Sequence, residues 1–174
     1  MPTPAREQIR LFELMALIAG WSLGLWLLIP IWRREANQPD PGRVMGAIVF
    51  SLGGLSLVGP PLLIWERRRR RTVWGAGRLM WFTQGTASWL MWPPIIYSRT
   101  RGIRSDSEVC YFYGTPLMAV YMTAALLFGG WFRKRKRRTL FRSWRERFGL
   151  GLALAWACIG LYFLSLFYYE DFRR

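Results

Sequence analysis

Five long stretches of this sequence contain no charged residue, and they constrain the fold more than any other feature. Each is 19 to 24 residues long, and they are Leu14–Trp32, Val44–Trp65, Leu79–Ser98, Val109–Phe132 and Phe148–Tyr169. A helix that crosses the bilayer core needs about 20 apolar residues, because it rises about 1.5 Å per residue through about 30 Å of hydrocarbon. An amphipathic helix of a soluble protein would instead carry charges on one face. The pattern therefore predicts an all-α integral membrane protein.

We predict a compact bundle that forms one transmembrane domain over residues 1–174. The expected spans are approximately 11–32, 44–65, 79–98, 109–132 and 148–169, and the first is not expected to be a cleaved signal peptide. The third span has an alternative, because polar residues and the Pro93–Pro94 pair interrupt it. The alternative is four spans plus one interfacial or re-entrant segment.

The distribution of basic residues separates these two topologies, since Lys and Arg are enriched in loops that remain in the cytoplasm. If 79–98 crosses, the N-terminus shares one side with the basic loops 66–78 and 133–147, and that side holds 17 of the 25 basic residues. If 79–98 lies on the surface, the division is 13 against 12. We therefore favour five spans with the N-terminus inside and the C-terminus outside. The expected location is the cytoplasmic membrane of a prokaryote.

The two basic loops have three interpretations: topology determinants only, contacts with anionic lipid headgroups, or a site for a protein or nucleic-acid partner. Near an anionic surface, each juxtamembrane Lys or Arg contributes about 1 kcal/mol of attraction. The candidate headgroup contacts are Arg67, Arg68, Arg69, Arg70, Arg71, Arg133, Lys134, Arg135, Lys136, Arg137, Arg138, Arg142 and Arg145. Apolar residues at helical spacing within 140–148 also predict a short surface helix before the last span. We expect membrane lipids and other membrane subunits, or a second copy, as partners, and no nucleic acid.

Polar residues of the third stretch fall on one side of its predicted helix. At 100° per residue, Gln84 and Ser88 share a face with Gly85, Trp81 and Trp92. Inside lipid this face should point at neighbouring helices, because an unpaired amide in hydrocarbon costs several kcal/mol. Two interpretations of this intramembrane polar face remain: hydrogen bonding between helices, or a ligand-binding or conducting surface.

Small residues recur every four positions in several stretches, which is the spacing of helix contacts in membranes. Ala16, Gly20 and Gly24 repeat in this way in the first stretch. Gly149 and Ala153 begin a similar series in the last. The pattern predicts close packing between helix backbones.

The residue types that carry most catalytic and metal chemistry are scarce in this chain. It has no His and only two Cys. Asp and Glu are absent from the five long apolar stretches. We therefore expect no catalytic residue, no cofactor and no metal site. The predicted function is that of a non-catalytic accessory, assembly or scaffolding subunit. The alternatives are a small channel or facilitator for an uncharged or anionic solute and, third, a membrane-embedded enzyme acting on lipid.

Overall fold

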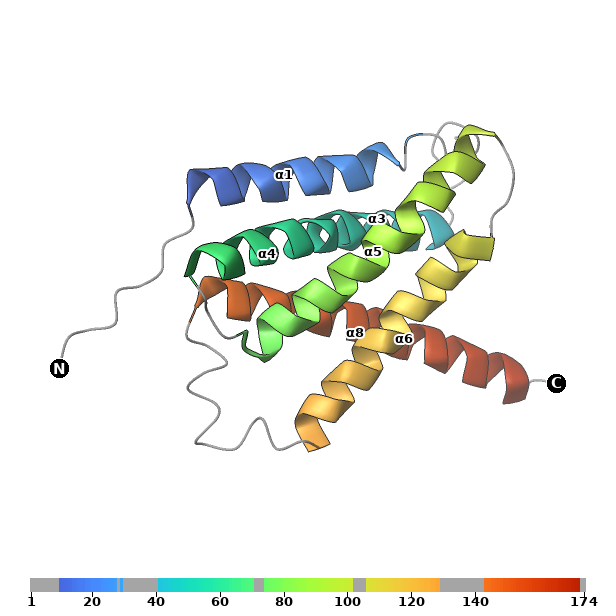
Figure 1. Cartoon of the computed structure of the whole chain (residues 1–174). Coiled ribbons are helices and arrows are strands. Elements are labelled where there is room, and N and C mark those ends of the chain that lie inside the picture. Colours follow the sequence, from blue (N-terminus) through green and yellow to red (C-terminus); the bar gives the residue numbers. More distant parts are fainter. Residues whose placement is uncertain are drawn as a thin grey trace.

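The computed structural model describes residues 10–27, 29, 41–70, 74–101, 106–128 and 143–172. Nearly all of these residues are helical, and no strand occurs among them (Figure 1). The helices are α1 (Leu11–Trp26), α3 (Pro41–Leu57), α4 (Gly59–Arg70), α5 (Ala76–Thr100), α6 (Asp106–Phe128) and α8 (Trp144–Phe172). The prediction of an all-helical fold is confirmed for the residues that the structure describes.

Two helical stretches are long and apolar enough to cross a membrane. They are Val44–Arg69, which covers most of α3 and α4, and Trp144–Leu166 in α8. The helix Leu11–Trp26 is also apolar but shorter. The doubtful stretch 79–98 lies within one uninterrupted helix of 25 residues, although Pro93 and Pro94 are inside it. Residues 30–32 and 129–132, which end two predicted spans, lie outside the described residues.

The helices extend beyond the charge-free stretches and include residues at the edges of the predicted basic loops. Residues 66–70 continue α4, residues 76–78 begin α5, and residues 144–147 begin α8. Trp144 and Phe148 do not belong to a separate surface helix, because both pack their rings against Trp81 inside the bundle. Four charged side chains at these helix ends are buried against one another: Glu66, Arg78, Arg145 and Glu146.

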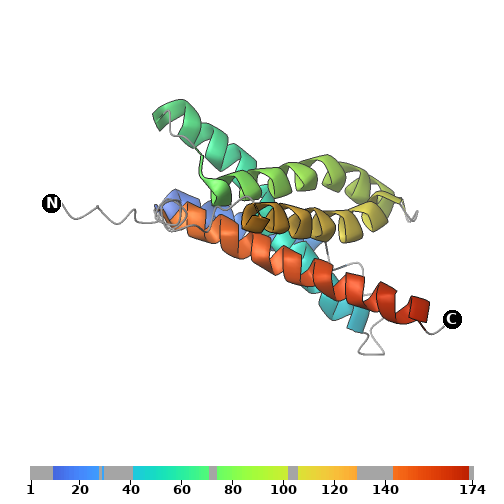
Figure 2. The ribbon, with the colours of Figure 1, turned by 90° about the horizontal axis from the view of Figure 1, so that it is seen from below.

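The helices run between two ends of an elongated bundle. α8 packs along α5 and α6, α5 also packs against α3 and α4, and α1 packs against α3 (Figures 1 and 2). The start of α1, the end of α4 and the starts of α5 and α8 gather at one end (Figure 1). We call this the amino end, because the chain enters the described fold there. The opposite end holds the start of α3 and the end of α8.

Backbone contact at small residues holds the helices together, as their spacing predicted. A Cβ atom on Gly20 would overlap the carbonyl oxygen of Gly54, and a Cβ on Gly54 would overlap that of Gly20. In the same way, a Cβ on Gly149 would overlap the carbonyl oxygen of Gly77. The first contact joins α1 to α3 and the second joins α5 to α8.

Aromatic rings fill the middle of the bundle. Phe50, Trp92, Tyr111 and Trp156 are buried, and their ring centroids lie 6.1 to 6.5 Å apart along the series. These rings come from α3, α5, α6 and α8. Tilted and edge-to-face contacts at such distances stabilise an interior beyond the area that they bury.

A break separates α3 from α4 at Val58, where the chain continues as Gly59–Pro60–Pro61. Proline has no N–H, so Pro60 and Pro61 cannot donate to the carbonyls four residues earlier, those of Ser56 and Leu57. A carbonyl left unpaired in an apolar interior costs free energy. The neighbouring helix therefore has to supply donors at this break.

Three residues of α5, spaced every four positions, lie beside the carbonyls of Leu55, Ser56 and Leu57. The indole Nε1 of Trp81 donates to the Leu55 carbonyl oxygen at 3.1 Å. The indole of Trp89 donates to the Leu57 oxygen at 2.9 Å. Between them, Gly85 lies so close to the Ser56 oxygen that a Cβ there would overlap it. Of the two carbonyls that lose a helical donor to the prolines, the Leu57 oxygen is thus paired by α5.

Replacing Trp89 by Phe should lower the free energy of unfolding by about 0.5–1.5 kcal/mol beyond the lost ring area, because the Leu57 carbonyl loses its donor. Pro61→Ala restores a backbone N–H that can reach the same carbonyl. The loss caused by Trp89→Phe should therefore be smaller when Pro61→Ala is present, as measured by a double-mutant cycle of unfolding in mixed detergent micelles. Strictly additive effects would show that the indole does not compensate for the proline.

Candidate functional site

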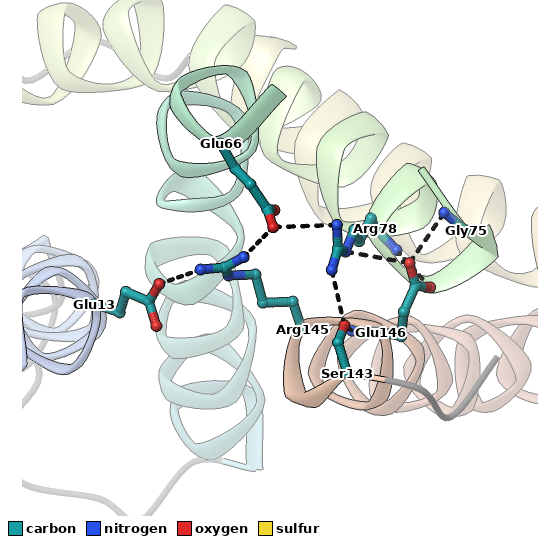
Figure 3. A network of polar contacts seen from close by, with 7 residues as sticks. All are labelled: Glu13, Glu66, Gly75, Arg78, Ser143, Arg145 and Glu146. Carbon is teal, nitrogen blue, oxygen red and sulfur yellow. Dashed lines mark hydrogen bonds and ion pairs between the residues drawn. The ribbon is translucent and has the colours of Figure 1, made fainter. Parts of the chain in front are cut away.

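Five charged side chains meet inside the amino end of the bundle (Figure 3). Glu13, Glu66, Arg78, Arg145 and Glu146 are each no more than 7% exposed. Arranged in order of contact they alternate in sign, from Glu13 through Arg145, Glu66 and Arg78 to Glu146. We call these five residues the ionic cluster. It joins α1, α4, α5 and α8.

Arg145 lies between two carboxylates from helices distant in sequence. Its guanidinium forms ion pairs with Glu13 of α1 and with Glu66 of α4. Glu13 is fixed locally as well, since its Oε2 accepts the backbone N–H of Arg10 at 3.1 Å and so caps the start of α1. Arg145 is therefore held between the first turn of α1 and the last turns of α4.

Arg78 completes the cluster on the side of α5. Its Nη1 lies 3.2 Å from Glu66 Oε1, and its Nε lies 3.3 Å from Glu146 Oε1. Its Nη2 donates to the hydroxyl of Ser143 at 3.0 Å. Glu66 is therefore shared by both arginines.

Glu146 binds the N-terminus of α5, where backbone N–H groups have no partner within the helix. Its carboxylate accepts the N–H groups of Gly75 at 3.0 Å, Gly77 at 2.8 Å and Arg78 at 3.3 Å. Ser143 meanwhile caps α8, because its hydroxyl accepts the N–H of Glu146 at 3.3 Å. Ser143 thus caps its own helix, α8, and Glu146 caps the neighbouring helix α5.

The ion pairs of the cluster stabilise the packing of the helices that carry them. Each of the five side chains has an oppositely charged partner, and the three carboxylates exceed the two guanidinia by one charge. Removing one partner from a buried ion pair typically costs about 3–5 kcal/mol, because the remaining charge stays buried without compensation. Four helices are consequently coupled at this end.

The predicted polar face of α5 points into the bundle. Gln84 and Ser88 are both fully buried, and the Ser88 hydroxyl lies 2.9 Å from that of Tyr111 in α6. Neither amide atom of Gln84 has a hydrogen-bond partner among the described residues. A neighbouring polar contact joins Trp156 Nε1 to the Ser56 hydroxyl at 3.1 Å. The Ser88–Tyr111 and Ser56–Trp156 pairs are therefore polar contacts between helices.

The candidate headgroup contacts separate into three groups. Arg67, Arg68 and Arg69 are exposed on α4, and Arg70 ends that helix. The remainder of the set apart from Arg145 lies outside the described residues: Arg71, Arg133, Lys134, Arg135, Lys136, Arg137, Arg138 and Arg142.

Arg145 requires a correction. It was expected at the lipid surface, but it is 3% exposed and paired with two carboxylates. A guanidinium engaged in this way cannot also bind a headgroup without leaving Glu13 and Glu66 uncompensated.

The described residues contain no group of three or more His, Cys, Asp or Glu side chains placed to hold a metal ion. Comparisons of the chain with protein-family models, with curated proteins and with solved structures each find no match. The function is therefore inferred from the residues and geometry of this chain alone.

Sequence reasoning missed most of the ionic cluster, because it treated charges beside the spans as loop residues. Two signals point to the cluster. The five-span topology already brings residues 13, 66, 78 and 145–146 to one side, so their opposite charges can meet. Ser143 and Glu146 also form the S-x-x-E spacing of a capping box, which marks a helix start at Trp144.

Proposed function

We propose that this chain is a multi-pass integral membrane protein of a prokaryotic cytoplasmic membrane and acts as a non-catalytic structural subunit. In this proposal the chain crosses the bilayer five times, through α1, α3 with α4, α5, α6 and α8. The ionic cluster lies at the cytoplasmic face. The subunit packs its outer helix faces against other membrane subunits or a second copy.

The main support for membrane insertion comes from α1, whose large apolar side chains face outward while its small residues and a glutamate face inward. Its buried face consists of Glu13, Leu17, Gly20 and Gly24. The outward face carries large apolar side chains that are 37% to 75% exposed: Leu11, Phe12, Leu14, Met15, Ile18, Trp21, Leu23, Leu25 and Trp26. A soluble protein would bury these groups, whereas lipid solvates them and leaves close packing of small residues to join the helices.

The position of the ionic cluster supports five crossings. Glu66 lies near the end of α4, Arg78 lies near the start of α5, and Arg145 and Glu146 lie in the first turn of α8. If 79–98 lay on the surface, the segments around 66–78 and 133–147 would be on opposite sides of the bilayer. Their contact therefore favours an odd number of crossings. The excess of basic residues on that side favours a cytoplasmic amino end.

The packing of the interior favours a structural role over conduction. Transporters commonly expose the carbonyls of broken membrane helices to ions or substrates. Here the indoles of Trp81 and Trp89 donate to the Leu55 and Leu57 carbonyls beside the break between α3 and α4. Solute moving along the Gln84–Ser88 face would also have to displace the rings of Trp92 and Tyr111, which contact each other beside Ser88.

The outer face of α8 has the spacing of a helix-packing surface. Small residues repeat every seven positions at Gly151, Cys158 and Ser165, and all three are exposed. Leu154 and Leu161 occupy the alternating positions and are 54% and 57% exposed. A heptad of this kind fits the side of another helix. This face supports the assignment as a subunit.

Extraction in a gentle detergent, followed by affinity purification and mass spectrometry, tests this role. We expect a stoichiometric membrane partner or a second copy of the chain. Gly151→Phe should release it, because a ring would cover the small-residue face of α8. Gly114→Phe on α6 is the matched control, since a Cβ at either glycine meets nothing within 4 Å. Recovery of the chain alone, as a monomer, would reject the subunit role.

A further inference from the structure

The charged residues at the amino end lie in two layers, a buried one that holds the carboxylates of the ionic cluster and an exposed one that holds arginines. The carboxylates of Glu13, Glu66 and Glu146 are buried in the cluster. Arg67, Arg68 and Arg69 project outward from the last turn of α4. Within the described residues, none of these three arginines has an ion pair with a carboxylate. The outer layer is therefore positive and available to an external anion.

Two of these arginines are oriented by tryptophan rings. The guanidinium of Arg67 lies 5.1 Å from the centre of the Trp74 ring. That of Arg69 lies 5.2 Å from the Trp65 ring. Stacking occupies the flat face of a guanidinium and leaves its edge of N–H donors free, and this edge matches two oxygens of a phosphate group. The stacks also restrict the side chains before a ligand arrives.

The position of these stacks along α4 matches the depth of lipid phosphates. Trp65 is the last residue of a charge-free stretch and is 40% exposed. Tryptophan at the end of a membrane span sits at headgroup level, because its ring is apolar and its N–H is polar. Arg69 lies one turn further along the helix. Its guanidinium, stacked on Trp65, is thus placed beside the phosphate layer.

We propose that Arg67, Arg68 and Arg69 at the end of α4, with Trp65 and Trp74, form a binding site for the phosphate group of an anionic lipid. The site rests on the proposed insertion in the membrane. Its ligand is a lipid phosphate of the cytoplasmic leaflet, not free phosphate. Of the thirteen basic residues first considered as headgroup contacts, the site contains three. These three are exposed and form no ion pair with a carboxylate among the described residues, and two of them lie over tryptophan rings.

Lipid retention on the purified full chain tests the site. The protein is held in nonionic detergent micelles that contain phosphatidylglycerol or phosphatidylcholine, and bound lipid is counted by native mass spectrometry. The variant Arg67→Gln/Arg68→Gln/Arg69→Gln should lose phosphatidylglycerol, with binding weaker by about fivefold per arginine, the ratio that corresponds to about 1 kcal/mol. The single variant Arg67→Gln, which disturbs the chain least, should show one such step.

The matched control is Arg101→Gln at the opposite end of the bundle. Arg101 also stacks on an aromatic ring, 4.7 Å from the centre of Tyr97, and the control should retain phosphatidylglycerol like the parent chain. The variant Arg67→Lys/Arg69→Lys keeps the charge but loses the planar donor edge, so it should bind less than the parent and more than the triple Gln variant.

Three results would overturn the site: equal retention of both lipids by the parent chain, equal losses in Arg101→Gln and the triple variant, or displacement of the lipid by millimolar inorganic phosphate. Incorporation into vesicles of phosphatidylcholine alone is measured separately. Failure of that step contradicts the proposed membrane insertion itself, whereas incorporation without selective retention contradicts only the lipid site.

Discussion

Arg145→Met should lower the free energy of unfolding by about 3–5 kcal/mol, the range found when one partner is removed from a buried ion pair. Methionine fills a similar volume but supplies no positive charge. Glu13 would then have no cationic partner among the described contacts, and Glu66 would retain only Arg78. The measurement is equilibrium unfolding of the purified chain in mixed detergent micelles, followed by circular dichroism.

Two companion variants make this test specific. Arg68→Met removes the same charge from an exposed position of α4 and should change stability by less than about 0.5 kcal/mol. Adding Glu13→Gln to Arg145→Met should recover part of the loss, because a neutral amide replaces the uncompensated carboxylate. If Arg145→Met and Arg68→Met have the same small effect, the ionic cluster does not hold the helices together.

Gly149→Ala should destabilise the bundle by about 1–3 kcal/mol, as overpacking of a close contact does. The new Cβ would overlap the carbonyl oxygen of Gly77, and this backbone belongs to the first turn of α5. That turn is also fixed by Glu146, whose carboxylate accepts its N–H groups. α5 and α8 would have to separate at the amino end, and the ionic cluster would be disturbed with them.

Gly151→Ala is the matched control, two residues further along the same helix. A Cβ at Gly151 meets nothing within 4 Å. This variant should be neutral or slightly stabilising, because alanine is favoured over glycine within a helix by about 0.5–1 kcal/mol. Equal thermal midpoints for Gly149→Ala and Gly151→Ala would contradict the close contact between α5 and α8.

The helical architecture could be predicted from the sequence because one physical rule governs most of it. Stretches without charge and of bilayer length have few stable forms other than a helix. Apart from the turns at Leu27 and Val58, the described residues of all five stretches are helical. The small residues at Gly20 and Gly149 could likewise be assigned to helix contacts, since their spacing and size leave one face able to approach a backbone.

The ionic cluster could not be predicted so directly, because charge alone does not reveal burial. Arg68 and Arg145 look alike in the sequence: both are arginines in basic segments beside a charge-free stretch. Their environments differ because Arg145 occurs on the turn of α8 that faces α1 and α4, whereas Arg68 faces outward. That distinction depends on helix rotation and on contacts between residues far apart in the sequence, such as Glu13 and Arg145, which are 132 positions apart.

The break between α3 and α4 could likewise be predicted only in part from the sequence. Pro60 and Pro61 predict an interruption from sequence alone. The partners of the exposed carbonyls could not be predicted, since Trp81 and Trp89 could equally have been interface anchors. Only the packing of α5 across the break assigns their indoles to Leu55 and Leu57.

The central claim is that lipid surrounds these helices and that the chain crosses it an odd number of times with the ionic cluster in the cytoplasm. Reporters fused after Arg174 test it most directly in living bacteria. Alkaline phosphatase, which is active only outside the cytoplasm, should be active there, and green fluorescent protein at the same site should remain dark. A fluorescent, phosphatase-inactive C-terminus would contradict the odd number of crossings, and a chain recovered in the soluble fraction without detergent would contradict the membrane assignment as a whole.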